Sequence, residues 1–352
     1  GDVTDEDLIA RENVVVTITS TGYAKRTKVD SYKAQKRGGK GVRGAELKQD
    51  DIVKNFFVCS THDWILFFTN FGRVYRLKAY ELPEGGRAAR GQHVANLLEF
   101  QPEEKIAQVI QIQSYEDAPY LVLATQQGRV KKSRLTDYES ARSAGLIAIN
   151  LNEGDALIGA QLVSEGDDIL LTSEQGQAIR FTADDDQLRP MGRATAGVKG
   201  MRFRGDDQLL SMSVVHDGEF LLVATSGGYG KRTAIEEYTP QGRGGLGVMT
   251  FKYTPKRGKL IGAISVDEDD EIFAITSAGG VIRTEVDQIR PSSRATMGVR
   301  LVNLADDVEL LAIDRNVEED GEEDAQAVAK GEKTVDEVQQ EHKAGDASKD
   351  EE

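Results

Sequence analysis

The chain has 352 residues, of which 39 % are hydrophobic, and it carries a formal net charge of −15. This length and hydrophobic content suffice for one large or two average domains with a sizeable core, which excludes a chain that is disordered throughout. No run of about 18 apolar residues is present, the first residues lack a signal-peptide pattern, and the single Cys59 excludes an internal disulfide framework. We therefore expect a soluble, cytoplasmic protein with one buried thiol.

The negative charge is concentrated at the C-terminal end. Residues 314–352 contain 15 acidic and 5 basic residues, whereas residues 1–313 contain 44 acidic and 39 basic ones. Because the long first part is nearly balanced, any attraction for a polyanion must come from gathering its bases on one surface.

One pattern recurs six times between residues 13 and 313. An apolar run ends in Thr or Ser, a glycine follows three positions later, and a basic residue stands four positions after the glycine. The six glycines are Gly22, Gly72, Gly128, Gly176, Gly228 and Gly279. Their spacing of 48 to 56 residues is typical of repeat architectures.

A second pattern keeps the same phase. It is an arginine followed three or four residues later by a glycine, and its arginines are Arg37, Arg87, Arg142, Arg193, Arg243 and Arg294. Because two independent markers agree, we interpret residues 13–313 as six repeats, preceded by a linker at residues 1–12.

Each repeat is predicted to form four short strands, as the fifth repeat illustrates. Residues 220–225 and 230–235 are β-rich runs on either side of a Ser-Gly-Gly turn, a third strand begins at Gly247, and a fourth covers residues 260–266. Four-stranded units of about 50 residues have the size of propeller blades, which close radially. With its 36 glycines, the sequence predicts an all-β, propeller-like disc of six blades rather than a parallel α/β fold.

The first marker places one or two basic residues after the turn of every repeat. These residues are Lys25, Arg26, Arg76, Lys131, Lys132, Arg180, Lys231, Arg232 and Arg283. In a single blade they would be read as a solvated strand face, but their recurrence in all six predicts a basic rim. Duplex DNA carries about one negative charge per 1.7 Å, so a rim of cations matches a bent DNA backbone. Bending it through about half a turn at a radius of roughly 25 Å costs on the order of 10 kcal/mol, which requires contacts from four or more blades.

The most distinctive segment lies in the first repeat. It consists of Gln35, Lys36, Arg37, Gly38, Gly39, Lys40 and Gly41. The glycines allow the backbone to approach a phosphate or another blade closely, and the three bases add charge and hydrogen-bond donors. The segment resembles the seven-residue signature of the A subunits of DNA gyrase, with Lys36 where arginine is usual. A partial copy in the fifth repeat includes Arg243 but has Leu246 in place of the last lysine, so we expect it to contribute less.

The resemblance extends over about residues 13–313 and includes the Gly-Tyr-x-Lys-Arg-Thr sequence that begins at Gly22. It implies a six-bladed β-pinwheel, a propeller variant whose blades exchange strands, that wraps duplex DNA and directs ATP-dependent negative supercoiling. It also implies that the 35–41 loop is essential and joins the first blade to the last. The implied partners are DNA, the ATPase subunit of an A2B2 complex, and the N-terminal catalytic part of the same subunit. ATP and Mg²⁺ belong to that complex, and neither a cofactor, a metal site nor a catalytic residue is expected in this chain.

Several alternatives stay open. The chain could be the corresponding domain of topoisomerase IV, although that family lacks an intact 35–41 signature, or a propeller whose disc face docks a protein. The acidic segment 314–352 is predicted to be disordered, or transiently helical near residues 335–338. It either solubilises the chain or folds back on the basic rim and competes with DNA. The Gly242–Gly247 dinucleotide-like pattern and the Asp184–Asp186 run are interpreted as turns.

Overall fold

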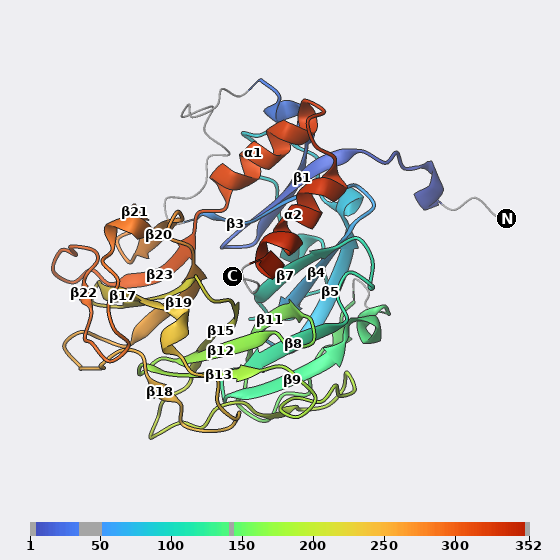
Figure 1. Ribbon diagram of the computed structural model, residues 1–352. Helices are drawn as coiled ribbons and strands as arrows, with labels where there is room; N and C mark the ends of the chain where they lie inside the picture. Colours follow the sequence, from blue (N-terminus) through green and yellow to red (C-terminus); the bar gives the residue numbers. More distant parts are fainter. Residues whose placement is uncertain (1–4, 35–50, 141–143, 349–352) are drawn as a thin grey trace.

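The computed structural model describes residues 5–34, 51–140 and 144–348, and β-strands dominate it (Figure 1). Twenty-three strands form six antiparallel sheets in this part of the chain, five of four strands and one of three. These sheets are the six predicted blades. None of the helices in the described part of the chain is long and apolar enough to cross a membrane.

Within each blade the strands are arranged from the centre of the disc outward. The innermost strands are β3 (Val53–Ser60), β7 (Ile106–Ile112), β11 (Leu157–Val163), β15 (Leu209–Val215), β19 (Leu260–Val266) and β23 (Leu310–Arg315). The second strands are β1 (Asn13–Thr19), β4 (Trp64–Thr69), β8 (Tyr120–Thr125), β12 (Asp168–Ser173), β16 (Phe220–Thr225) and β20 (Glu271–Thr276). The third strands are β2 (Tyr23–Lys28), β5 (Arg73–Lys78), β9 (Arg129–Arg134), β13 (Gln177–Thr182), β17 (Tyr229–Ala234) and β21 (Val281–Glu285).

The outermost strand of each blade has only two residues. In blades 1 to 5 these strands are β6 (Gln92–His93), β10 (Leu146–Ile147), β14 (Val198–Lys199), β18 (Val248–Met249) and β22 (Val299–Arg300). Short 3-10 helices follow several third strands or flank the sheets, namely η1 (Asp5–Leu8), η2 (Val29–Tyr32), η3 (Ala79–Glu81), η4 (Val94–Asn96), η5 (Leu135–Tyr138), η6 (Ile235–Glu237) and η7 (Val286–Gln288). In Figure 1, β18 and β22 lie at the periphery, whereas β7, β11, β15 and β19 run through the middle.

The first sequence marker is the turn between the second and third strands. In blade 5 the Gly228 amide donates to the Thr225 carbonyl (3.0 Å), and the Tyr229 amide donates to the Thr225 hydroxyl (3.2 Å). Gly228 has φ +86°, a conformation that side chains with a Cβ rarely adopt. The threonine and the glycine therefore recur because every hairpin needs the same turn.

The second marker belongs to the exchange of strands between blades. β18 is part of the fifth repeat but pairs with β13 of blade 4, through Gln177 opposite Met249 and Ala178 opposite Val248. A Cβ on Gly247, just before β18, would lie 2.2 Å from the Ala178 carbonyl oxygen, so only glycine permits this approach. The strand exchange implied by the resemblance is confirmed, and the third predicted strand of each of repeats 2 to 6 completes the preceding blade.

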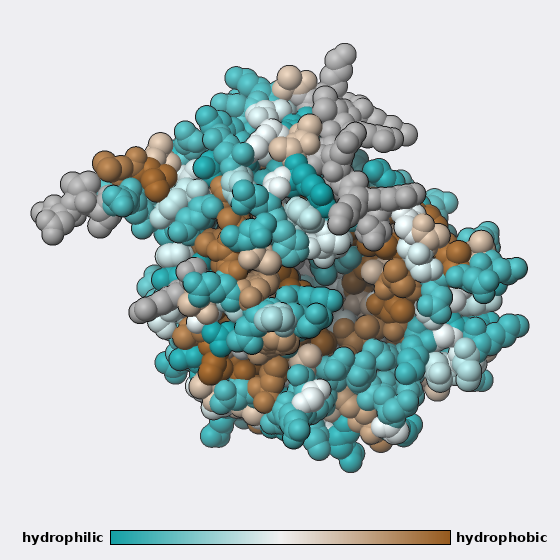
Figure 2. All heavy atoms as spheres, turned by 180° about the vertical axis from the view of Figure 1, so that it is seen from behind, coloured by the Kyte–Doolittle hydropathy of each residue, from teal (hydrophilic) through white to brown (hydrophobic). Residues whose placement is uncertain are grey.

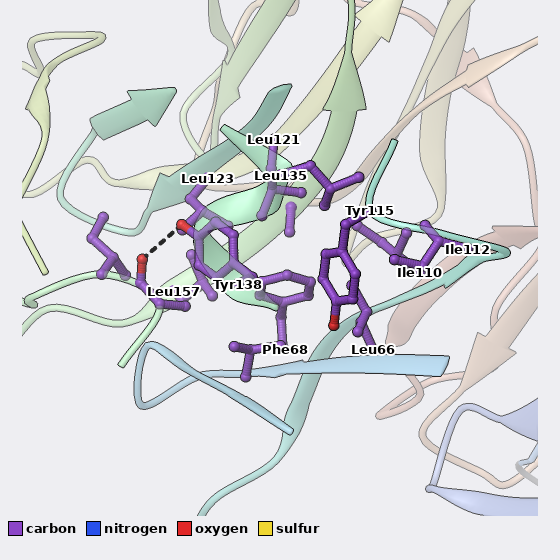
Figure 3. Packing of buried hydrophobic residues seen from close by; sticks show 14 residues of the cluster. Leu66, Phe68, Ile110, Ile112, Tyr115, Leu121, Leu123, Leu135, Tyr138 and Leu157 are labelled. Carbon is purple, nitrogen blue, oxygen red and sulfur yellow. Dashed lines mark hydrogen bonds between the residues drawn. The ribbon is translucent and has the colours of Figure 1, made fainter. Parts of the chain in front are cut away.

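The hydrophobic core lies between adjacent blades. The cluster between blades 2 and 3 contains 14 buried residues, and Figure 3 shows the Tyr138 ring close to Phe68 within it. Their centroids are 6.2 Å apart, and the Tyr138 hydroxyl donates to the Ala148 carbonyl (3.0 Å). Cys59 is fully buried between blades 1 and 2, and burial raises the pKa of its thiol well above the usual value, as expected for an inert cysteine. From the opposite side, hydrophobic residues gather in a hollow near the centre of a largely hydrophilic surface (Figure 2).

The acidic segment is predicted from the sequence to be disordered, or transiently helical near residues 335–338; helices occupy most of it, including residues 335–338. α1 (Glu318–Ala329) and α2 (Val335–Ser348) form two helices that lie along β3 of blade 1 (Figure 1). Val328, Val335 and Val338 enter a buried cluster with Val58 and Tyr32. The few apolar residues of this segment therefore suffice, because they share one face and meet an apolar surface that blade 1 already provides.

Candidate nucleic-acid interface

The lysines of the first marker are buried. Lys25, Lys131 and Lys231 lie on the third strands of blades 1, 3 and 5 and are at most 5 % exposed. The Lys231 Nζ donates to the carbonyls of Arg294 (2.6 Å) and Thr296 (2.8 Å), in the loop of the following repeat. Lys25 and Lys131 bind the corresponding loops in the same way. Desolvation lowers the pKa of Lys25 and of Lys231 to about 8, and that of Lys131 to about 7.

The next residue along the strand ties each blade to its neighbour. The Arg180 Nη1 donates to the Tyr238 carbonyl of the next blade (3.2 Å), while its Nε donates to the Asp168 carboxylate (2.8 Å). The same combination of a carbonyl in the next blade and a carboxylate partner is found at Arg26, Lys132 and Arg232. These bases recur because every blade must bind the next one.

The two remaining bases of this set differ from each other. The Arg76 guanidinium stacks on Trp64 at 3.8 Å from the ring centroid and donates to the Tyr115 hydroxyl (3.0 Å). The Arg283 side chain, in blade 6, is 68 % exposed and lies 3.6 Å from the Glu271 carboxylate.

The predicted rim of exposed first-marker bases is therefore wrong in its geometry for every base of the set except Arg283, which is exposed. Lys25, Lys131, Lys132, Lys231 and Arg232 are buried, so a phosphate cannot reach their charged groups without unfolding the junction. Arg26 and Arg180 are mostly covered and paired with carboxylates, and Arg76 is held against aromatic rings. The physical reason is that the third strand is not the edge of the blade, because the outermost strand and its loop cover it.

The signature segment Gln35–Gly41 and Arg142 lie outside the described residues. Their roles stay predictions from the sequence.

Three of the second-marker arginines, Arg193, Arg243 and Arg294, lie on the outside of the disc. Arg193 Nη1 donates to the Ile147 carbonyl (2.6 Å), and Arg294 Nη1 donates to the Met249 carbonyl (2.7 Å). Arg243 Nη1 makes the equivalent bond to the Lys199 carbonyl (2.9 Å). Each guanidinium thus binds an edge carbonyl of the outermost strand of the preceding blade.

Further bases connect these arginines into a continuous band. The Arg129 Nε donates to the Ala196 carbonyl (3.1 Å), next to β14, and the Arg202 Nε donates to the Gly244 carbonyl (3.1 Å). The Arg257 Nη1 donates to the Met297 carbonyl (2.7 Å), just before β22. We call this band the outer belt and define it as Arg73, Arg129, Arg193, Lys199, Arg202, Arg243, Arg257, Arg294 and Arg300.

The outer belt differs from the first-marker bases in its electrostatics. All nine side chains are partly or fully exposed, and among the described residues none of them forms an ion pair within 4.0 Å. An arginine with one N–H on a carbonyl keeps other donors for a ligand, in a guanidinium that is already positioned. The outer belt can therefore bind a long polyanion across blades 2 to 5.

Acidic residues of α1 face bases of blades 1 and 2. The Arg87 Nη2 lies 3.3 Å from the Glu322 carboxylate, and its guanidinium stacks over Tyr32 at 4.6 Å. Burial raises the pKa of Glu318, and the nearby Glu322 carboxylate raises it further. α1 therefore occupies the basic surface at this end of the disc.

Of the outer belt, only Arg243 is among the DNA contacts predicted from the sequence. A signal for Arg193 and Arg294 is present, because both belong to the second marker. Lys199 and Arg300 give no such signal, because the equivalent position in the other repeats is occupied by His93, Ile147 and Met249. Within the described segments, no group of three or more His, Cys, Asp or Glu side chains could hold a metal ion.

Comparisons with known proteins agree with the repeat structure. The family model of the DNA gyrase C-terminal domain, beta-propeller, matches residues 13–60, 63–113, 119–164, 167–216, 219–267 and 270–316. Each matched segment corresponds to one repeat of the sequence.

Curated relatives are DNA gyrase A subunits. That of Mycolicibacterium smegmatis is 69 % identical over 320 residues, covering 91 % of this chain and 38 % of the relative. That of Mycobacterium tuberculosis H37Rv is 68 % identical over 325 residues, covering 92 % and 39 %. That of Streptomyces coelicolor is 62 % identical over 323 residues, covering 90 % and 38 %. The chain thus spans well under half the length of these relatives.

Solved structures show the same architecture. A C-terminal domain of DNA topoisomerase IV is similar with a TM-score of 0.82 and 28 % identity, covering 92 % of this chain and 99 % of that one. A DNA gyrase A C-terminal domain gives a TM-score of 0.65 and 29 % identity, with 86 % and 99 % covered.

Proposed function

The chain belongs to the family of DNA gyrase A C-terminal β-propeller domains, and from this premise we propose that it bends duplex DNA around its outer belt. The observation that supports this proposal is the segregation of its bases. Most first-marker bases are used for contacts between blades, whereas the nine bases of the outer belt have no carboxylate partner among the described residues. A chain with a net charge of −15 thus keeps an uncompensated positive surface.

The energetics favour a ligand that touches several blades. Each phosphate that is neutralised by a base releases counterions. The logarithm of the binding constant therefore falls with the logarithm of the salt concentration, with a slope of about −0.9 per contact. Bending the duplex costs on the order of 10 kcal/mol, and a belt that extends over four blades can offset this cost. Contacts to phosphates carry no sequence information, so we expect binding with little sequence preference.

The wider role belongs to the same proposal. We propose that the chain is a non-catalytic part of a type II topoisomerase, in which wrapped DNA directs ATP-dependent negative supercoiling in the bacterial cytoplasm. Its partners would be the ATPase subunit of an A2B2 complex, where ATP and Mg²⁺ act, and the N-terminal catalytic part of its own subunit. The 35–41 segment is proposed to be essential for wrapping. Identities of 62 to 69 % to gyrase A subunits favour gyrase over topoisomerase IV.

The proposal is tested by removing the charges of the belt residues that are exposed rather than half-buried. Lys199, Arg202 and Arg300 are exposed, and changing all three to Gln removes three positive charges. We expect the slope of log binding constant against log salt to shrink by about two to three. Nicked-circle ligation should show a smaller change of linking number per bound chain.

A matched variant removes three exposed bases from elsewhere. Arg11, Lys54 and Lys330 lie outside the belt, and their change to Gln alters the net charge equally. We expect the wild-type salt slope from this variant. Equal effects of the two variants would show that only net charge matters, and absence of any linking-number change with wild-type protein would favour a protein-docking propeller.

A further inference from the structure

The outermost strands of the disc present an alternation of side chains that the basic outer belt alone does not explain. In β10, β14 and β18 the first residue is half-buried and the second is exposed, whereas both residues of β22 are exposed and the order is reversed in β6. The second residues of blades 1 to 5 are His93, Ile147, Lys199, Met249 and Arg300. Blades 3 and 5 thus present a base at this position, whereas blades 2 and 4 present a large apolar side chain.

Ile147 and Met249 are exposed although they are apolar. Ile147 is 40 % exposed and Met249 is 39 % exposed, while their strand neighbours Leu146 and Val248 pack against the interblade cores. Single exposed apolar side chains are common on protein surfaces, so these two gain significance only from their place among the arginines of the outer belt.

Both apolar side chains lie inside the outer belt. Arg193 binds the carbonyl of Ile147 (2.6 Å), and Arg73 stands opposite Ile147 in the sheet. Arg294 binds the carbonyl of Met249 (2.7 Å). Each apolar group is therefore held in a fixed position beside one or more positive charges.

This combination identifies the class of partner. A protein surface that buried Ile147 would also have to desolvate the guanidinium groups of Arg73 and Arg193, which is costly without matching carboxylates. A DNA groove offers both kinds of surface, since deoxyribose carbons and base edges lie between two rows of phosphates. Its phosphates can pair with the arginines while the apolar side chain contacts the groove.

We propose that Ile147 and Met249 contact the deoxyribose and base edges of a DNA groove, while the neighbouring belt arginines bind the flanking phosphates. This inference rests on the proposed function of the outer belt. It makes blades 2 and 4 the points where an apolar second residue contacts the duplex and blade 3 the point of ionic contact, while blade 5 presents both Arg300 and the 52 % exposed Val299. Groove contacts of this kind favour bent DNA over straight DNA.

The test compares apolar truncation with loss of charge. Ile147→Ala with Met249→Ala should weaken binding of a duplex of several tens of base pairs about three- to tenfold at every salt concentration, because apolar contacts release no counterions. Lys199→Ala should instead reduce the salt slope by about one. Leu8→Ala with Leu311→Ala, which truncates two exposed apolar side chains outside the outer belt, should bind like the wild type. Circular dichroism and the melting temperature establish that each variant is folded.

The outcomes separate this inference from the function on which it rests. Wild-type protein that fails to bind DNA overturns both. Wild-type protein that binds DNA, together with an Ile147→Ala, Met249→Ala variant of unchanged affinity and linking-number change, overturns the inference alone. A loss of salt slope in that variant, like that of Lys199→Ala, also overturns it, since displaced arginines would then be the cause.

Discussion

Lys131 lies on the third strand of blade 3, and its ammonium group is enclosed by backbone carbonyls. Its Nζ donates to the carbonyls of Ala148 and Arg193, one from its own repeat and one from the next. Desolvation lowers the pKa of Lys131 to about 7, with nearby Arg193 acting in the same direction. Because the unfolded chain exposes this lysine, its pKa there is about 10.4.

This difference predicts how stability responds to pH. Between about pH 7 and pH 10 the unfolded chain keeps a proton that the folded chain has released at Lys131, so this lysine makes the free energy of unfolding rise with pH. Lys131→Met removes that contribution and leaves two carbonyls without a donor, which should lower stability by about 1 to 3 kcal/mol near pH 7. The gap to wild type should widen up to about pH 10, as measured by urea unfolding at a series of pH values.

A second variant serves as the control for this prediction. Arg134→Gln changes an exposed base at the end of the same strand. Its stability should follow the wild-type pH dependence, because its charge is solvated in both states. If the free energy of unfolding of Lys131→Met changed with pH in parallel with that of the wild type, the lowered pKa of Lys131 would be contradicted.

At the residue scale, the sequence revealed recurrence but not orientation. Lys131 and Lys132 follow the same turn glycine as their counterparts in other repeats, which favours a place on the rim for both. Adjacent residues of a strand face opposite sides, and in a propeller both sides of a blade are covered by neighbouring blades. A base that recurs in every blade is therefore explained equally well by contacts between blades and by binding of a ligand. The atoms that the side chain contacts in the structure distinguish the two roles.

The helical hairpin formed by α1 and α2 could have been predicted at the scale of elements. Thr334 and Glu337 have the spacing of a capping box, and the Glu337 amide donates to the Thr334 hydroxyl (3.0 Å). Gly331, with φ +74°, ends the first helix. Acidic residues fill the first turn of α1, where the helix dipole favours them. Composition alone predicts disorder, because it ignores these signals and the apolar face of blade 1.

The position of α1 predicts that its carboxylates compete with DNA. Glu322 pairs with Arg87, so it holds α1 over bases that a phosphate could otherwise approach. Glu318→Gln with Glu322→Gln should weaken this docking and tighten DNA binding about two- to fivefold at about 0.1 M salt. Fluorescence anisotropy with a labelled duplex measures the effect, which should vanish at about 0.5 M salt.

The control for this prediction removes the same charge from the far side of the hairpin. Glu332 and Glu337 are exposed and form no ion pair among the described residues. Glu332→Gln with Glu337→Gln should change affinity much less. Equal tightening by both variants would indicate long-range repulsion between the acidic segment and DNA rather than competition for Arg87.

At the scale of the whole molecule, the period and the strands followed from the sequence. Residues 220–225 and 260–266 are predicted as strands and coincide with β16 and β19. The exchange of the short outermost strands could not be derived from the pattern in one repeat, because the pairing partners belong to successive repeats. The outer belt escaped prediction for the same reason, since it is assembled from loops of successive repeats.

The junctions between blades differ in how many buried apolar residues they contain, and this difference determines how firmly the disc is closed. The clusters between consecutive blades from 1 to 6 contain 10 to 14 buried residues each. The cluster between blades 6 and 1 contains three, namely Ile52, Phe273 and Ile275. β3 also lies against α1 and α2, whereas β7, β11, β15, β19 and β23 lie side by side. Among the described residues, little apolar surface therefore holds this one seam closed.

We predict that the disc opens at the seam between blades 6 and 1. Spin labels at Lys28→Cys and Glu285→Cys span this seam, and labels at Glu81→Cys and Glu139→Cys span the junction of blades 2 and 3. Because Cys59 is buried, it should not compete for label. Double electron–electron resonance should give a broad distance distribution across the first pair and a narrow one across the second. Ile52→Ala should broaden the distance distribution across the seam further and leave that across the junction of blades 2 and 3 unchanged. Equally narrow distributions for the two wild-type label pairs would show that the three-residue cluster closes the ring as firmly as the larger clusters.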